Sequence, residues 1–154
     1  MDEGGSGLGP LGAFMGTYTP RLDEKGRLIL PARFRPPLAT GLVITRGYDR
    51  CIALFPVEQF RAVLDRLRGF PYEDRRARDL LRGLLAFAVD EVPDRQGRIP
   101  VSPALREYAG IDRDVAVVGQ DTRIEVWNSA TWHEYLAAHE DEYAGTGEGV
   151  VGTP

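Results

Sequence analysis

The residues best suited to binding chemistry in this sequence are two arginines, each placed four residues after an aspartate. Asp23-Glu-Lys-Gly-Arg27 and Asp94-Arg-Gln-Gly-Arg98 share the pattern D-x-x-G-R. A guanidinium group can donate two hydrogen bonds to the O6 and N7 acceptors of guanine in the major groove of DNA. We therefore expect Arg27 to contact base edges. For Arg98, an ion pair with Asp94 is the alternative to a contact with DNA.

Three further cations near the first motif are suited to phosphate contacts, which position a protein on DNA without reading its sequence. Arg33 and Arg35 lie at the start of an expected short helix, and Lys25 lies in the turn, where it suits either a phosphate or a base. The alternative is an ordinary solvated surface, because the chain uses arginine at most of its basic positions.

The aspartate and the glycine of each motif are expected to have structural roles. Asp23 and Asp94 are suited to accepting backbone N–H groups within the turn, or to pairing with the arginine four residues later. Gly26 and Gly97 are expected to adopt a positive φ, which the turn requires.

No residue pattern indicates catalysis or a metal centre. His133 and His139 are six residues apart, which is not the i, i+4 spacing of a helical metal pair. The single cysteine, Cys51, cannot form an internal disulfide and is expected to be a small buried apolar residue. The sequence contains neither a P-loop nor a G-x-S-x-G nucleophile motif. It therefore predicts a protein that is not an enzyme and has no cofactor, bound metal or small-molecule substrate.

Length and composition are typical of one soluble globular domain. The chain has 154 residues, of which 43% are hydrophobic and 27% charged. The charge-free stretch 83–89 is far shorter than the roughly 20 apolar residues of a membrane-spanning helix. Residues 1–13 include Asp2, Glu3 and five glycines, unlike a secretory signal. These features predict a cytoplasmic protein without a membrane partner.

Charge is distributed unevenly along the chain. Residues 1–106 contain 17 Lys and Arg against 13 Asp and Glu, a net charge of +4, whereas residues 107–154 contain 2 against 10, a net charge of −8. Five cations lie within residues 21–35. This local basic patch is expected where phosphates bind, although charge alone does not distinguish it from a solvated surface.

An internal repeat indicates the architecture. Residues 23–35 recur as 94–106, and residues 43–60 recur as 115–132, with eight identities in 31 aligned positions. Each copy predicts two β-hairpins joined by a short helical turn and followed by a helix. So few strands cannot bury a core alone, so the two copies are expected to pack about a pseudo-twofold axis with both D-x-x-G-R turns on one face. The fold class is α+β, mainly β with flanking helices.

The elements expected in the first copy are strands at 18–22, 27–30, 42–45 and 51–55, a helical turn at 31–38 and a helix at 56–67. Those expected in the second are strands at 88–92, 98–101, 115–118 and 123–127, a helical segment at 103–108 and a helix through 131–136, with a further helix at 72–87 between the copies. The predicted organisation is a disordered extension (1–13), a first repeat (17–60), a helical linker (61–87), a second repeat (88–132), the end of the C-terminal helix (133–143) and a disordered tail (144–154).

The segment from Asp23 to Arg35 and its weaker copy at 94–106 resemble the MraZ family of bacterial transcriptional regulators. The resemblance covers about residues 14–143 and includes Phe14-Met-Gly-Thr-Tyr18 and Glu125-Val-Trp127. It implies the AbrB/SpoVT swapped-hairpin β-barrel, built here from two tandem repeats in one chain.

The family resemblance also implies a function. It implies a sequence-specific DNA-binding regulator, usually a repressor, of the division and cell-wall gene cluster that includes its own gene. Family members form rings of about eight subunits and bind repeated G-rich boxes in double-stranded DNA, which implies a nucleoid-associated location. The residues that match the DNA-contacting turns are Asp23, Lys25, Arg27, Arg33, Arg35, Asp94, Arg98 and Arg106. Gln96 and Ala104 replace the second copies of Lys25 and Arg33, which predicts unequal contributions from the two repeats.

Two other interpretations stay open. One is a ring-forming scaffold whose arginine turns bind acidic protein surfaces. The other is an AbrB-type antitoxin that binds DNA and caps a toxin with its C-terminal tail, although no long amphipathic segment follows Tyr143.

Overall fold

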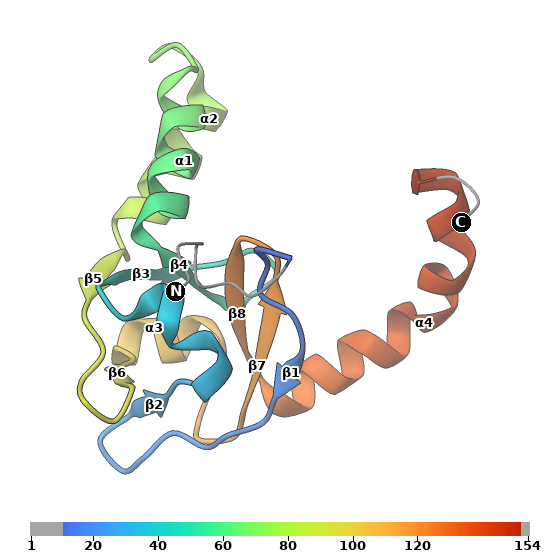
Figure 1. The fold of residues 1–154 in the computed structure, drawn as a ribbon. Coiled ribbons are helices and arrows are strands. Elements are labelled where there is room, and N and C mark those ends of the chain that lie inside the picture. Colours follow the sequence, from blue (N-terminus) through green and yellow to red (C-terminus); the bar gives the residue numbers. More distant parts are fainter. Residues whose placement is uncertain (1–10, 152–154) are drawn as a thin grey trace.

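The computed structural model describes residues 11–151, which form eight β-strands and four α-helices (Figure 1). The strands are β1 (Thr17–Tyr18), β2 (Arg27–Ile29), β3 (Leu42–Arg46), β4 (Ile52–Pro56), β5 (Val89–Glu91), β6 (Arg98–Pro100), β7 (Val115–Gln120) and β8 (Arg123–Asn128). The helices are α1 (Val57–Arg68), α2 (Arg75–Leu85), α3 (Pro103–Tyr108) and α4 (Ser129–Val151), with 3-10 turns η1 (Ala32–Phe34) and η2 (Pro36–Leu38). This mixture confirms the predicted α+β class.

The order of the strands reflects the internal repeat. Six strands form one antiparallel sheet in the order β1-β7-β8-β4-β3-β5, and β2 pairs with β6 in a separate two-stranded ribbon. Exchanging β1 with β5, β3 with β7 and β4 with β8 reproduces the same order in reverse. The two halves are therefore related by a pseudo-twofold axis, and closure into a barrel stays a prediction.

Each repeat exchanges its first two strands with the other repeat. The sequence predicts that residues 18–22 and 27–30 pair with each other, but the structure corrects this: β1 pairs with β7, and β2 pairs with β6. In the same way, β5 pairs with β3 of the first repeat. This exchange places Leu28 opposite Ile99, and both side chains are fully buried. Burial of apolar side chains, each contributing about 1.5–3 kcal/mol, favours pairing across the repeats over two separate hairpins.

The second hairpin of each repeat agrees with the sequence prediction. β3 pairs with β4, and β7 pairs with β8, in regular antiparallel register. Asp49 and Asp121 occupy equivalent positions in the two connecting turns, and both have positive φ, at 59° and 65°. One hydrophobic core spans both repeats; it includes Leu28, Leu30, Leu42, Ile44, Ile52, Leu54, Ile99, Val101, Val115, Val117, Ile124 and Val126.

Helices α1 and α2 extend together away from the ribbon formed by β2 and β6 (Figure 1). α1 buries Phe60 against Phe55 of β4, whereas α2 has no fully buried residue. α2 is held by its C-terminal end instead, because Arg46 donates from Nε and Nη2 to the Gly83 carbonyl at 3.0 and 2.9 Å. α2 begins later than predicted because the Asp74 side chain caps it, accepting the Ala77 N–H.

Helix α4 starts against the sheet and then leaves the body of the molecule (Figure 1). Its first turns place Trp132 against the buried Trp127, with ring centroids 5.1 Å apart. The helix continues through Val151, which corrects the disordered tail predicted from residue 144. Glycines lower helix propensity without breaking the hydrogen-bond ladder, and no proline interrupts this segment. The last three predicted tail residues, 152–154, lie outside the described residues.

At the other end, residues 1–10 of the predicted extension lie outside the described residues, and residues 11–13 form a turn before the buried Phe14. Between residues 11 and 151, no helix is both long enough and apolar enough to cross a lipid bilayer.

Candidate nucleic-acid interface

Arg27 and Arg98 project from the same face of the ribbon formed by β2 and β6. Arg27 is opposite Pro100, and Arg98 is opposite Ile29. Because side chains alternate along a strand, these four residues share the outer face, while Leu28 and Ile99 point into the core. Diagonal positions of this kind are about 7–8 Å apart. The ribbon therefore presents two neighbouring guanidinium groups to solvent.

Asp23 fixes the conformation of the first turn through three hydrogen bonds. Its Oδ1 accepts the N–H groups of Lys25 and Arg27, each at 2.9 Å, and its Oδ2 accepts Arg27 Nε at 2.8 Å. These contacts, chiefly the bond from the Arg27 backbone, lower the pKa of Asp23. The carboxylate thus performs both roles considered from the sequence: it closes the turn and orients the arginine.

The second turn has the same hydrogen bonds. Asp94 Oδ1 accepts the N–H groups of Gln96 and Arg98 at 2.9 Å, and Oδ2 accepts Arg98 Nε at 2.7 Å. The pKa of Asp94 is likewise lowered, with the backbone bond from Arg98 as the largest cause. Arg27 and Arg98 side chains are each 29% exposed. Their terminal amino groups make no hydrogen bond to the residues that the structure describes, and so are available to a ligand.

Gly26 and Gly97 have φ values of +76° and +78°, the conformation expected for both turns. Each glycine is also in close contact with an arginine of the other repeat. A Cβ atom added to Gly26 would lie 2.8 Å from Nη1 of Arg106, and one added to Gly97 would lie 2.5 Å from Nε of Arg35. Both glycines are therefore required for space as well as for φ.

The cations around the two turns are grouped differently in space than in sequence. Arg106 lies beside the first turn, with Lys25 and Arg27, whereas Arg35 lies beside the second turn, with Arg98. This exchange makes the two clusters more equal in charge than the linear repeats suggest.

The other predicted cations differ in exposure and pairing. Lys25 and Arg33 are exposed and form no ion pair among residues 11–151. Arg35 and Arg106 are partly buried. Arg21, at the start of the basic patch, pairs with Asp114 at 2.9 Å. Lys25 and Arg33 are thus the most accessible of the predicted phosphate contacts.

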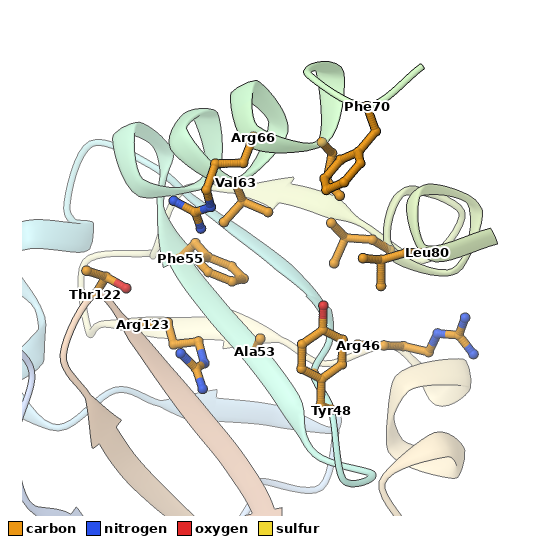
Figure 2. Close-up of a pocket in the computed structure, with 13 residues that line it drawn as sticks. Arg46, Tyr48, Ala53, Phe55, Val63, Arg66, Phe70, Leu80, Thr122 and Arg123 are labelled. Atoms are coloured by element: carbon orange, nitrogen blue, oxygen red, sulfur yellow. The ribbon is translucent and has the colours of Figure 1, made fainter. Parts of the chain in front are cut away.

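A groove on another part of the molecule was not anticipated from the sequence. It lies between the helices α1 and α2 and strand β4, and has a volume of about 440 Å³ (Figure 2). Phe55, Val63 and Leu80 form apolar parts of its wall, and Arg66 and Arg123 add positive charge. The helical spacing of the leucines in α2 indicated an apolar face, but the arginines come from segments far apart in the sequence.

Cys51 agrees with its predicted structural role. Its side chain is fully buried, and its thiol donates to the Tyr48 carbonyl at 3.2 Å. Burial strongly raises the pKa of the thiol, so Cys51 stays protonated and unreactive near neutral pH.

Comparison with known proteins agrees with the two-repeat architecture. Residues 13–83 and 84–146 separately match the family described as "MraZ protein, putative antitoxin-like". A protein of Micrococcus luteus named Transcriptional regulator MraZ is 54% identical over 138 residues, which cover 90% of this chain and 96% of that protein. Proteins of the same name from Salinispora tropica and Arthrobacter sp. (strain FB24) are 52% and 48% identical, again over 90% of this chain and over 97% and 98% of their own lengths. Two consecutive family matches, on a fold whose halves exchange strands and present matching turns, show that this chain belongs to the MraZ family.

Proposed function

We propose that this protein is a sequence-specific regulator of transcription that binds double-stranded DNA through the ribbon formed by β2 and β6. The observation that carries the proposal is the pair of arginines on the outer face of that ribbon, each oriented by an aspartate. A two-stranded ribbon fits into the major groove, where arginine donates to guanine O6 and N7. The names of the relatives support the regulatory role.

Arg27 and Arg98 are assigned to base contacts. Their diagonal spacing of about 7–8 Å corresponds to roughly two base-pair steps, so both can contact one short G-rich segment. Lys25 and Arg33 are assigned to phosphate oxygens, because both are exposed and without an acidic partner among residues 11–151. Gln96 replaces the lysine in the second turn, so the first turn contributes more to affinity.

Self-association into a ring, of about eight subunits by family resemblance, is the second part of the proposal. The groove beside α1 and α2 is apolar with arginines on its walls, and α4 extends from the body with exposed Glu134, Leu136 and Glu140. An acidic helix with apolar side chains complements such a groove. Binding of several subunits to repeated boxes raises avidity by roughly 10²–10⁴ over a single module.

The biological target proposed is the promoter region of the division and cell-wall cluster that contains the protein's own gene, where binding represses transcription. This places the protein on the nucleoid in the cytoplasm. The family description also contains the word antitoxin. A toxin-capping role would use a surface other than the ribbon and is tested separately from DNA binding.

Fluorescence anisotropy tests the proposal. The full chain is titrated onto a labelled duplex from upstream of its own gene and onto a scrambled duplex of the same composition, at several salt concentrations. We expect tighter binding to the upstream duplex and a steep fall in affinity with salt, whose slope counts the phosphates neutralised. Arg61→Ala, on the exposed face of α1, is the matched control and leaves binding unchanged. Equal affinity for both duplexes would contradict sequence-specific regulation and favour a protein-binding scaffold.

A further inference from the structure

Arg35 and Arg106 occupy equivalent positions in the two repeats, and each packs against the turn of the other repeat. The guanidinium of Arg106 lies against Gly26, where an added Cβ would meet Nη1 at 2.8 Å and Cζ at 3.0 Å. Arg35 lies against Gly97, where an added Cβ would meet Nε at 2.5 Å and Cδ and Cζ at 2.9 Å. The contact is therefore reciprocal, and it involves the side chains closest to both glycines.

Backbone hydrogen bonds reinforce these contacts in the same crossed sense. The N–H of Leu30 donates to the Gly97 carbonyl at 2.8 Å, and the N–H of Val101 donates to the Gly26 carbonyl at 3.1 Å. Each turn is thus attached to the opposite repeat through its glycine. The carbonyl of Leu30 also accepts Arg35 Nε at 2.8 Å, which fixes that side chain beside the second turn.

The two arginines differ in how they are held. Arg106 Nε is buried and has no hydrogen-bond partner among the described residues, whereas Arg35 Nε is paired. Arg106 is therefore held beside the first turn by packing of its planar guanidinium, and Arg35 by packing together with a hydrogen bond. We expect the Arg35 contact to be the stronger of the two.

From this geometry we propose that Arg35 and Arg106 are positioning residues, each of which holds the D-x-x-G-R turn of the opposite repeat in its DNA-binding conformation. A partly buried guanidinium packed against a glycine restricts the turn that carries Arg27 or Arg98. The two turns are then coupled parts of one interface. In this assignment, phosphate contact belongs to the exposed Lys25 and Arg33 rather than to Arg35 and Arg106.

Amide hydrogen exchange of the DNA-free full chain tests the proposal directly. In Arg106→Ala, the amides of Lys25 and Arg27 exchange about tenfold faster, while those of Gln96 and Arg98 are unchanged. In Arg35→Ala the pattern reverses, and the acceleration is larger. Arg33→Ala is the matched control, because this neighbouring exposed arginine touches neither glycine, and it leaves both turns unchanged.

Arg106→Lys separates positioning from charge. It keeps a cation at the site but removes the planar group packed against Gly26. We expect the amides of Lys25 and Arg27 to exchange faster in this variant too. If Arg106→Ala loses protection throughout the sheet, its fold is affected, and Arg106→Lys supplies the result.

DNA binding provides a second measurement, which rests on the proposed function. Arg106→Ala weakens binding to the upstream duplex with an unchanged salt slope, whereas Lys25→Ala reduces the slope by about one unit, as expected for a lost phosphate contact. Unchanged exchange at the opposite turn, with a slope reduced by about one in Arg106→Ala, would overturn the positioning role. Failure of the unmodified protein to prefer the upstream duplex would contradict the proposed function only, since the crossed exchange pattern needs no DNA.

Discussion

The Nε atom of Arg27 lies 2.8 Å from Oδ2 of Asp23, and the same carboxylate accepts the backbone N–H of Arg27 through Oδ1. Main chain and side chain of one arginine are thus held by one acidic group. A guanidinium fixed in this way loses less conformational entropy on binding than a free arginine side chain. The pair therefore prepares the ribbon for a ligand with two closely spaced acceptors.

Removing the guanidinium of Arg27 is expected to weaken sequence-specific DNA binding. Arg27→Ala loses about 1–3 kcal/mol per base contact, and Arg98→Ala loses less because Gln96 leaves the second turn with fewer cations. Anisotropy with the upstream and scrambled duplexes measures both losses. Equal losses would contradict the inequality of the turns, and full binding by Arg27→Ala would remove this residue from the interface.

The two aspartates predict a pH dependence of stability. Hydrogen bonds from the turns lower the folded-state pKa of Asp23 and Asp94 below their unfolded value. Their stabilising effect is therefore fully present above the unfolded pKa, near pH 4, and is lost as the pH falls through the lower folded values. The double variant Asp23→Asn/Asp94→Asn is expected to be less stable than the unmodified protein at pH 6 and to approach it as the pH falls below 4. Urea unfolding across this range measures the difference, and a constant gap down to pH 3 would count against the prediction.

Alanine at Gly26 is expected to cost more than alanine at another glycine with positive φ. Gly26 has φ +76° and the Arg106 guanidinium in its space, whereas Gly110 has φ +63° and nothing within 4 Å. Gly110→Ala carries only the backbone cost of about 1–2 kcal/mol, and Gly26→Ala must also displace Arg106. Chemical denaturation compares the two free energies of unfolding. Equal losses would mean that the arginine moves aside without cost.

Arg46 is expected to control the attachment of α2 to the sheet. Its guanidinium donates twice to the Gly83 carbonyl and lies 4.1 Å from the ring centroid of Phe87. Because α2 has no fully buried residue, Arg46→Ala removes a principal contact, worth about 1.5–3 kcal/mol for hydrogen bonds from a charged group. Thermolysin should cleave the α1–α2 region of this variant faster. Arg61→Ala, whose side chain pairs only with Glu58 among the described residues, is the control.

The groove predicts which leucine of α2 supports self-association. Leu80 lines the groove and is 37% exposed, whereas Leu85 is 43% exposed and does not line it. Leu80→Glu places an acidic group among apolar walls and should reduce the oligomer mass measured by light scattering after size-exclusion chromatography. Leu85→Glu should leave the mass unchanged. Equal effects of the two variants would exclude the groove as the site of subunit contact.

Much of the fold follows from local sequence patterns. Alternating apolar residues predict β3, β4, β7 and β8 to within about two residues, and Asp-x-x-Gly predicts both turns with positive φ. These features depend on interactions between residues near in sequence. The internal repeat added the pseudo-twofold relationship, because two similar segments adopt similar structures.

Features that depend on the other repeat could not be predicted in this way. A strand such as 27–30 has the same apolar pattern whether its partner lies five or seventy residues away, so the pairing of β2 with β6 is not encoded locally. The same limitation applies to Arg35 and Arg106, whose neighbours in sequence suggested one turn while their side chains lie beside the other. Capping by Asp74 and the contact from Arg46 to Gly83 likewise depend on tertiary arrangement.

The pairing of β1 with β7 has a consequence for synthesis of the protein. Thr17 is opposite Val118, so the first strand emerges from the ribosome about a hundred residues before its partner has been translated. Throughout that interval, the apolar strands of the first repeat lack the residues that complete their core. Final folding must therefore follow translation of nearly the whole chain, and a truncated product leaves apolar strands accessible to chaperones and proteases.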